Sequence, residues 1–228
     1  MVDLDPAGPV GPAGPAPQNQ AEGHDRVGAD LLRAAGEVLA SEGPTALTVR
    51  RIAQVAGVST MNVYSRFGSK DGVVEHLYIE GFTRLRNAIE SPGATNDPMS
   101  DLRNCGEAYR RFAVEFPTFY SVMFDGVVDY HPSPRAIEHA SGTLQLLAGR
   151  LQRAMEAGVL APDDPMVTAA SVWAACHGVV SLERQQVGPP LLDWTAVYQR
   201  TMSALMIGLA GVPGVPSDSS THDAAPRD

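Results

Sequence analysis

The sequence predicts an all-α protein in which a small helix-turn-helix domain precedes a larger helical domain. Apolar residues recur every three or four positions along most of the chain, which is the spacing of a helix that buries one face. No stretch alternates between apolar and polar residues in the way that a half-buried strand does. The chain has 228 residues, of which 44% are hydrophobic and 19% charged, so it can bury a sizeable core. We therefore expect helices and no strands.

The two ends of the chain differ in composition from its body. Residues 1–24 consist mainly of Gly, Pro and Ala, and residues 211–228 are rich in Pro, Ser, Thr and Asp. Such segments have too few apolar side chains to form a core. We expect a disordered tail at each end, a helix-turn-helix domain over residues 25–72 and the larger domain over residues 73–210.

Capping and turn residues divide the small domain into helices. Its first helix carries an apolar stripe and ends before the Gly-Pro sequence at 43–44. Thr48 is a favourable N-cap for a short second helix. The Gly-Val-Ser sequence at 57–59 ends that helix and begins a third one. The Gly-Ser sequence at 68–69 then separates the third helix from a long fourth.

Five further helices complete the predicted larger domain. Prolines stand at or near their starts, where the missing N–H costs no helical hydrogen bond. We expect these helices near residues 100–115, 118–129, 133–157, 165–184 and 191–209.

Charge is unevenly distributed along the chain. The formal net charge is −9, but the segment 26–70 holds six bases against three acids, a net charge of +3, so the rest carries −12. A locally basic segment on an acidic body suits a polyanion partner for that segment only.

Composition and motifs exclude several classes of protein. There is no run of about 18 apolar residues and no basic or apolar leader before Arg26, so we expect no membrane span, no signal peptide and a cytoplasmic location. Cys105 and Cys176 are too few for a disulfide framework, and no second ligand stands at metal spacing from Cys176 and His177, so no metal is expected. No phosphate-binding glycine loop or hydrolase motif is present, so we expect neither a cofactor nor an enzymatic activity.

The two short helices joined by Gly-Val-Ser have the pattern of a helix-turn-helix motif. Ala53 is small where the two helices would cross, and Gly57 stands where the turn needs a left-handed backbone. The polar side chains left on the outer face of the second short helix could enter a DNA major groove. A purely structural corner between two helices is the alternative, because such corners also use glycine.

The motif and its surroundings resemble one known family. The sequences TVRRIAQVAGVS at 48–59 and VYSRFGSKD at 63–71, with ASEGP at 40–44, look like the DNA-binding domain of TetR-type bacterial transcriptional regulators. The resemblance covers about residues 27–75. It implies a three-helix DNA-binding domain followed by a helical ligand-binding and dimerisation domain. Asn62 and Gly68 depart from the residues often found at their positions, which leaves the base preference open.

The resemblance assigns DNA contacts to both short helices and to the start of the fourth. Thr48, Tyr64 and Lys70 are expected to contact phosphates. Arg50 is expected to reach a base or a phosphate, whereas a solvated charge is the open alternative for Arg51 and for Arg66. The full predicted set is Thr48, Arg50, Arg51, Ser59, Thr60, Met61, Asn62, Tyr64, Ser65, Arg66 and Lys70, with Thr60, Met61 and Asn62 as base readers.

The larger domain has a weaker pattern. Aromatic residues gather between 109 and 124, and a Trp-xxx-His-Gly sequence at 173–178 is similar to that of one class of TetR-type C-terminal domain. Trp173 and His177 share a helix face, so they could give a small-molecule cavity an apolar wall with one polar group. A plain hydrophobic core is the alternative for the aromatic residues, and a structural hydrogen bond is the alternative for His177. The predicted ligand-binding set is Tyr109, Phe112, Phe116, Tyr120, Met123, Phe124, Trp173 and His177.

These features together favour a ligand-responsive, dimeric DNA-binding regulator. We expect a repressor that a small-molecule effector releases from a palindromic double-stranded DNA operator. Surplus apolar faces on the helices at 165–184 and 191–209 suit a homodimer interface, although a hairpin inside a monomer would use similar residues. The alternatives are an enzyme and a helical small-molecule-binding protein that does not bind DNA.

Overall fold

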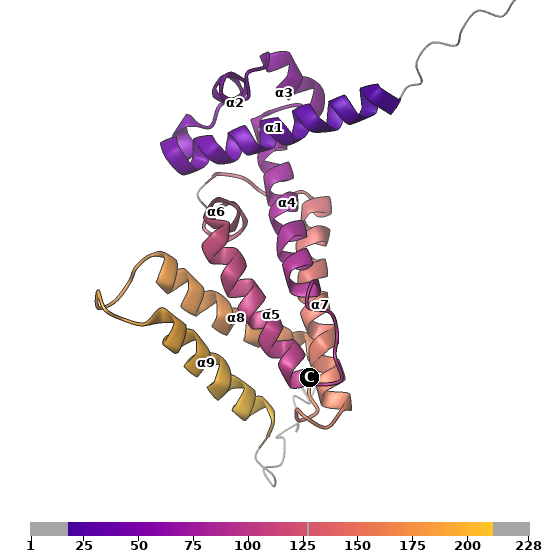
Figure 1. Ribbon diagram of the computed structural model, residues 1–228, viewed down its shortest axis with the longest axis vertical. Helices are drawn as coiled ribbons and strands as arrows, with labels where there is room; N and C mark the ends of the chain where they lie inside the picture. Colours follow the sequence, from indigo (N-terminus) through magenta and orange to yellow (C-terminus); the bar gives the residue numbers. More distant parts are fainter. Residues whose placement is uncertain (1–17, 127, 212–228) are drawn as a thin grey trace, which may run out of the picture. The chain divides into compact units, whose positions relative to one another are not determined.

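The computed structural model describes residues 18–126 and 128–211, and Figure 1 shows their arrangement as helices joined by short loops. Nine α-helices and one short 3-10 helix account for the regular structure of these residues, with no strand among them, which confirms the all-α prediction. The chain forms two compact units, Met1–Val73 and Val74–Asp228, called the first and the second unit below. Most of both predicted tails lies outside the described residues.

The first unit holds the helix-turn-helix. Its elements are α1 (Gln18–Glu42), η1 (Pro44–Ala46), α2 (Val49–Val55), α3 (Thr60–Phe67) and the start of α4 (Lys70–Glu90). The helix α1 begins at Gln18, so residues 18–24, which the sequence placed in the tail, are helical. The 3-10 turn η1 was not predicted, and it follows from Pro44 at its first position after Gly43.

Local caps and turns set the ends of these helices as predicted. The Thr48 hydroxyl accepts a hydrogen bond from the Arg51 N–H and so caps α2. Gly57 and Gly68 have φ angles of 68° and 72°, the left-handed region that glycine adopts without strain, and they end α2 and α3. Apolar side chains of three helices are fully buried between them: Leu31, Val38, Ile52 and Val63.

The second unit contains the rest of α4 and five further helices. These are α5 (Pro98–Glu115), α6 (Pro117–Phe124), α7 (Pro134–Glu156), α8 (Pro165–Arg184) and α9 (Trp194–Leu209). Proline occupies the first position of four of them, as the sequence predicted. The helix α6 stops five residues before its predicted end, because Asp125 closes it and Gly126 follows with a φ of 62°.

The core of the second unit is built around α8. This helix packs on α5, α7 and α9, and Figure 1 shows α9 running beside it. By length (20 residues) and mean hydropathy (1.3), α8 is also the one helix of the described residues that would suit a membrane span. Core helices of globular domains share these properties, and Ala169, Val172 and Cys176 of α8 belong to the buried core.

Candidate nucleic-acid interface and ligand cavity

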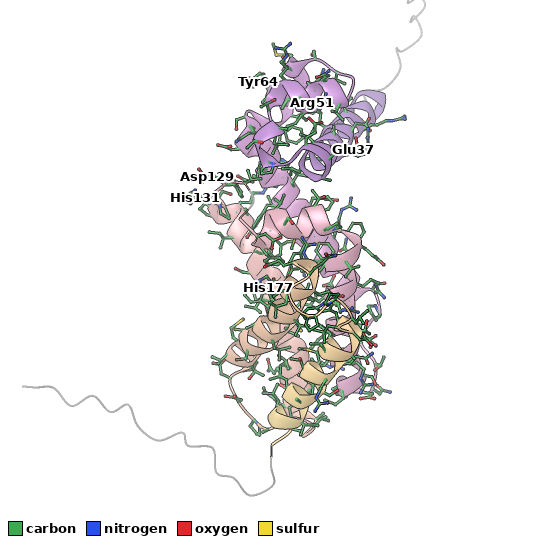
Figure 2. The ribbon with its side chains drawn as sticks, turned by 90° about the vertical axis from the view of Figure 1, so that its left-hand side faces the viewer. Glu37, Arg51, Tyr64, Asp129, His131 and His177 are labelled. Atoms are coloured by element: carbon green, nitrogen blue, oxygen red, sulfur yellow. The ribbon has the colours of Figure 1, made fainter. Side chains whose placement is uncertain are left out.

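The outer face of α3 presents the residues that the sequence assigned to base reading. Thr60, Met61, Tyr64 and Ser65 are exposed, and the fractions for Met61 and Tyr64 are 70% and 53%. Figure 2 shows Tyr64 at the surface of the first unit. The eight-residue helix thus presents two large side chains, Met61 and Tyr64, beside polar ones on its outer face.

Three of the predicted residues form a hydrogen-bonded chain along α3. The Asn62 amide donates to the Ser59 hydroxyl at 3.1 Å, and its carbonyl oxygen accepts from the Arg66 guanidinium at 2.9 Å. Ser59 occupies the N-cap position without capping the helix N–H groups through its side chain. Asn62 is therefore held in one orientation at the start of α3. Both polar atoms of its side chain already have hydrogen-bonding partners within the protein when no DNA is bound.

The arginines of α2 differ in their surroundings. Arg50 is exposed, whereas Arg51 lies against α1 and makes hydrogen bonds to both carboxylate oxygens of Glu42, at 2.7 Å and 3.0 Å. These bonds hold the pKa of the Glu42 carboxyl below its usual value. Arg51 would have to leave Glu42 in order to reach a phosphate. Lys70, the only lysine of the chain, begins α4 directly after Ser69, whose hydroxyl accepts the Gly72 N–H.

A largely apolar cavity of about 650 Å³ lies within the second unit, and residues from α4 to α9 line it. This volume is in the usual range for small-molecule sites. Four of the eight predicted ligand-binding residues are on its wall: Tyr109, Met123, Phe124 and Trp173. Sequence reasoning missed two groups of wall residues. One group comes from α4: Tyr78, Phe82, Leu85 and Ile89. The other consists of sulfur-containing residues: Met99, Cys105, Cys176, Met202 and Met206.

The other four predicted residues are not part of this wall. Phe112 and Tyr120 are fully buried in the core, and Phe116 packs on Phe112 with 5.6 Å between ring centroids. His177 lies among the helices of the second unit, as Figure 2 shows, and is half-buried. None of these four residues lines the cavity, although the His177 ring contacts two residues that do, Phe124 and Trp173.

His177 has a hydrogen-bonding partner on each side of its ring. Its Nδ1 atom is 2.8 Å from the Tyr120 hydroxyl and 3.2 Å from the Tyr109 hydroxyl, and its Nε2 atom is 3.3 Å from the Ser181 hydroxyl. Burial lowers the pKa of His177 below its ordinary value, and the Asp125 carboxylate opposes this only in part. A neutral imidazole that links α5, α6 and α8 is a structural arrangement, which favours the alternative interpretation of His177.

No metal site is apparent in the described part of the chain. Within it, no group of three His, Cys, Asp or Glu side chains is arranged to hold a metal ion. Cys105 and Cys176 are free thiols, and both are buried.

A helix-turn-helix with an exposed face on its second helix, followed by a larger helical unit, is the arrangement of a DNA-binding regulator. Comparison with protein families agrees with this class. Residues 31–77 match the bacterial regulatory proteins of the tetR family, and residues 102–205 match the tetracyclin repressor-like C-terminal domain. The chain belongs to the tetR family of bacterial regulatory proteins, whose members are transcriptional regulators rather than enzymes. No curated protein matches the chain.

Solved structures share the fold at low sequence identity. A protein of unknown function from Rhodococcus sp. RHA1 is 22% identical over 81% of this chain and 96% of its own, with a TM-score of 0.71. The TetR family transcriptional regulator PfmR from Thermus thermophilus is 24% identical over 78% of this chain and 98% of its own, with a TM-score of 0.63. The fatty acid degradation regulator FadR from Bacillus halodurans is 20% identical over 80% of this chain and 96% of its own, with a TM-score of 0.65.

Proposed function

We propose that the protein is a dimeric repressor that binds a palindromic operator in the cytoplasm and leaves it when a small molecule enters the cavity of the second unit. The observation that carries the DNA-binding part is the exposed face of α3. Met61 and Tyr64 are exposed there beside a polar chain that includes Asn62 and Arg66. A helix of this kind reads a major groove with the side chains at its N-terminal end.

A dimer is supported by the outer faces of α8 and α9. On α8, Val167 and Leu182 are 61% and 45% exposed, and the positions between them on that face are small. On α9, Ile207 is 74% exposed beside Gly208. Small and apolar side chains on two neighbouring helices let a second pair approach closely and bury these faces. Two copies would then place two α3 helices on the two half-sites of a palindrome.

Ligand response is supported by the cavity. Its wall is mainly apolar, and six helices contribute to it, so a molecule that fills it contacts several helices at once. A ligand releases DNA only if it binds the DNA-free conformation more tightly than the DNA-bound one.

The test of DNA binding uses the DNA upstream of the protein's own gene in an anisotropy titration at several salt concentrations. Cationic contacts release counterions, so the logarithm of the affinity should fall with the logarithm of salt by roughly 0.9 per phosphate contacted. Lys70→Ala should reduce this slope by about one unit per protomer contact. Arg33→Ala is the matched control, since Arg33 carries the same charge in the first unit but pairs with Glu37 at 2.7 Å.

Absence of specific binding to any upstream fragment would contradict the proposed function. An equal loss of slope in Lys70→Ala and Arg33→Ala would remove Lys70 from the interface and leave only a general effect of charge. Sedimentation of the free protein tests the dimer, and a screen for compounds that release the bound fragment tests the ligand response.

A further inference from the structure

The side-chain amide of Asn62, near the start of α3, is held from two sides. Its nitrogen donates to the Ser59 hydroxyl at 3.1 Å, and its oxygen accepts from the Nη1 atom of Arg66 at 2.9 Å. Ser59 stands three residues before Asn62 and Arg66 four residues after it, so the two partners lie on either side of the amide along one helix face. The amide is therefore fixed along the direction of the helix axis.

Arg66 decides which way round the amide is held. A guanidinium has N–H donors and no acceptor, so the amide atom that faces it must be the oxygen. If the amide turned over, its NH2 group would meet the N–H groups of Arg66, and donor would face donor. The Ser59 hydroxyl can donate or accept and so tolerates both orientations. The amide nitrogen consequently faces the N-terminal side of α3 and the oxygen its C-terminal side.

Arg66 is itself supported by the body of the first unit. It is half-buried, and its stem packs against α1 beside Gly28, where a methyl group would lie 3.9 Å from the Arg66 Cδ atom. Its Nη1 atom is also 3.4 Å from the Asn62 backbone carbonyl oxygen and from the Ser65 hydroxyl. These contacts give Arg66 a fixed position from which it can orient the amide.

The amide keeps one donor and one acceptor for a further partner. A primary amide has two N–H donors and two oxygen lone pairs, and the contacts with Ser59 and Arg66 use one of each. Ser59 and Ser65, which flank Asn62 on this face, are exposed. A base edge brought against this face of α3 would meet the second N–H and the second lone pair in a fixed order.

Adenine is the base that satisfies both groups. In the major groove its N7 acceptor lies beside its N6 donor, which complements the N–H and the oxygen of an amide. Guanine offers two acceptors there, and cytosine offers its N4 donor alone. Where T·A replaces A·T, the O4 acceptor of thymine takes the place of the N6 donor, and an amide that cannot turn would set its oxygen against it. A fixed amide therefore distinguishes A·T from T·A.

We propose that Asn62 reads one adenine in each half-site of the operator, and that Arg66 is a positioning residue that sets the orientation of the Asn62 amide. This inference rests on the proposed function, because it names the base that α3 recognises. It also separates Arg66 from the phosphate contacts, since its Nη1 atom is directed at Asn62.

The test begins with selection of the best-bound duplex from a library of random DNA sequences by the full-length protein. Anisotropy titrations then compare this duplex with variants in which each base pair is replaced in both half-sites. The wild type should prefer A·T over T·A and G·C by about tenfold or more at one position of each half-site. Asn62→Ala should lose that preference. Asn62→Asp, which has acceptors only, should prefer C·G there, because cytosine N4 donates to a carboxylate.

Arg66→Met separates positioning from a phosphate contact, because it removes the donors and keeps an apolar stem against α1. Without Arg66 the amide can turn and donate to thymine O4, so the preference for A·T over T·A should fall by about threefold or more. The preference over G·C should stay, since neither orientation of the amide matches two acceptors. Arg33→Met is the matched control for loss of charge, and it should keep both preferences.

Equal weakening of every duplex in Arg66→Met, with a salt slope reduced by about one unit beyond that of Arg33→Met, would make Arg66 a phosphate contact and overturn the proposal. If Arg66→Met does not fold, Asn62→Asp provides the test, because an adenine preference that survived in that variant would also overturn it.

The proposed function fails in a different way. A wild type that selects no sequence from the library would contradict sequence-specific DNA binding itself. A selected sequence whose base preferences all survive in Asn62→Ala would overturn the assignment of Asn62 and leave the DNA-binding regulator standing.

Discussion

The two units of this protein pair their polar groups over very different sequence distances. In the first unit the side-chain pairs are local: Arg66 with Asn62 at a separation of four residues, and Arg51 with Glu42 at nine. The second unit has local pairs too, such as Arg84 with Glu80, but it adds remote ones: Arg110 with Glu183 at 73 residues, and the Tyr198 hydroxyl with the Gly106 carbonyl at 92. A DNA-contacting surface whose pairs are local can be recognised from the sequence as a motif. A cavity held by remote pairs is defined only once the helices are packed.

The largest expected effect comes from a glycine at the start of α4. A methyl group at Gly72 would overlap the Phe67 carbonyl oxygen, a backbone atom that cannot turn away. Gly72→Ala should therefore destabilise the first unit by about 3 kcal/mol or more and abolish operator binding. Thermal unfolding followed by circular dichroism, with an operator titration, measures both effects.

Binding of a cavity ligand should survive in Gly72→Ala if the second unit folds on its own. The matched control is Gly36→Ala, because a methyl group there meets no atom within 4 Å. That variant should be more stable than the wild type by about 0.5–1 kcal/mol, as expected for alanine in a helix. Loss of ligand binding in Gly72→Ala would mean that the two units do not fold independently.

An intermediate effect is expected from the remote cluster around His177. His177→Ala leaves the hydroxyls of Tyr109, Tyr120 and Ser181 without their common partner, which should cost about 1–3 kcal/mol of stability. The ligand concentration that releases DNA should stay unchanged, because His177 is outside the cavity wall. Trp173→Ala, which alters the wall itself, is the control that should change it.

The lowered pKa of His177 adds a pH dependence to this prediction. The unfolded chain binds a proton at His177 near the ordinary pKa of 6.5, and the folded chain does so only at lower pH. The stability of the second unit should therefore fall as the pH drops below 6.5 toward the folded pKa, and this fall should be smaller in His177→Ala. Equal pH profiles for the two proteins would show that His177 does not titrate differently on folding.

The smallest expected effect comes from the local pair of Arg51 and Glu42. Both side chains are more than a third exposed, so water and salt screen the attraction between them. Arg51→Ala and Glu42→Ala should each shift the melting temperature slightly, and the shift should vanish in 1 M salt. A double-mutant cycle at low and high salt measures the coupling. A coupling energy that persisted in 1 M salt would show that this pair stabilises the fold through contacts that salt does not screen.

The sequence predicted the fold class and most helix ends because these depend on neighbouring residues. Thr48, Gly57 and Gly68 act within one turn of their own positions, and each has the role that its sequence context predicted. The exposed residues of α3 were predicted for the same reason.

The cavity was predicted only in part because its wall depends on which helix faces which. Aromatic spacing identified Tyr109 and Phe124, but the same spacing also selected Phe112, which points into the core. No sequence signal marks the pairing of Arg153 on α7 with the buried Asp101 on α5. Such pairings appear only when α5 and α7 are side by side.

The two cysteines have a practical consequence for spectroscopy. Cys105 and Cys176 are the only thiols of the chain, both are buried, and burial raises the pKa of each. Thiol-reactive dyes attack the thiolate, so at neutral pH both native cysteines should remain unlabelled in the folded protein. A single cysteine introduced at exposed Ile137 or Leu191, which belong to neither proposed interface, would then carry a fluorophore or spin label with the native thiols left in place. Distances between such labels in the free, DNA-bound and ligand-bound protein could follow the regulatory cycle directly.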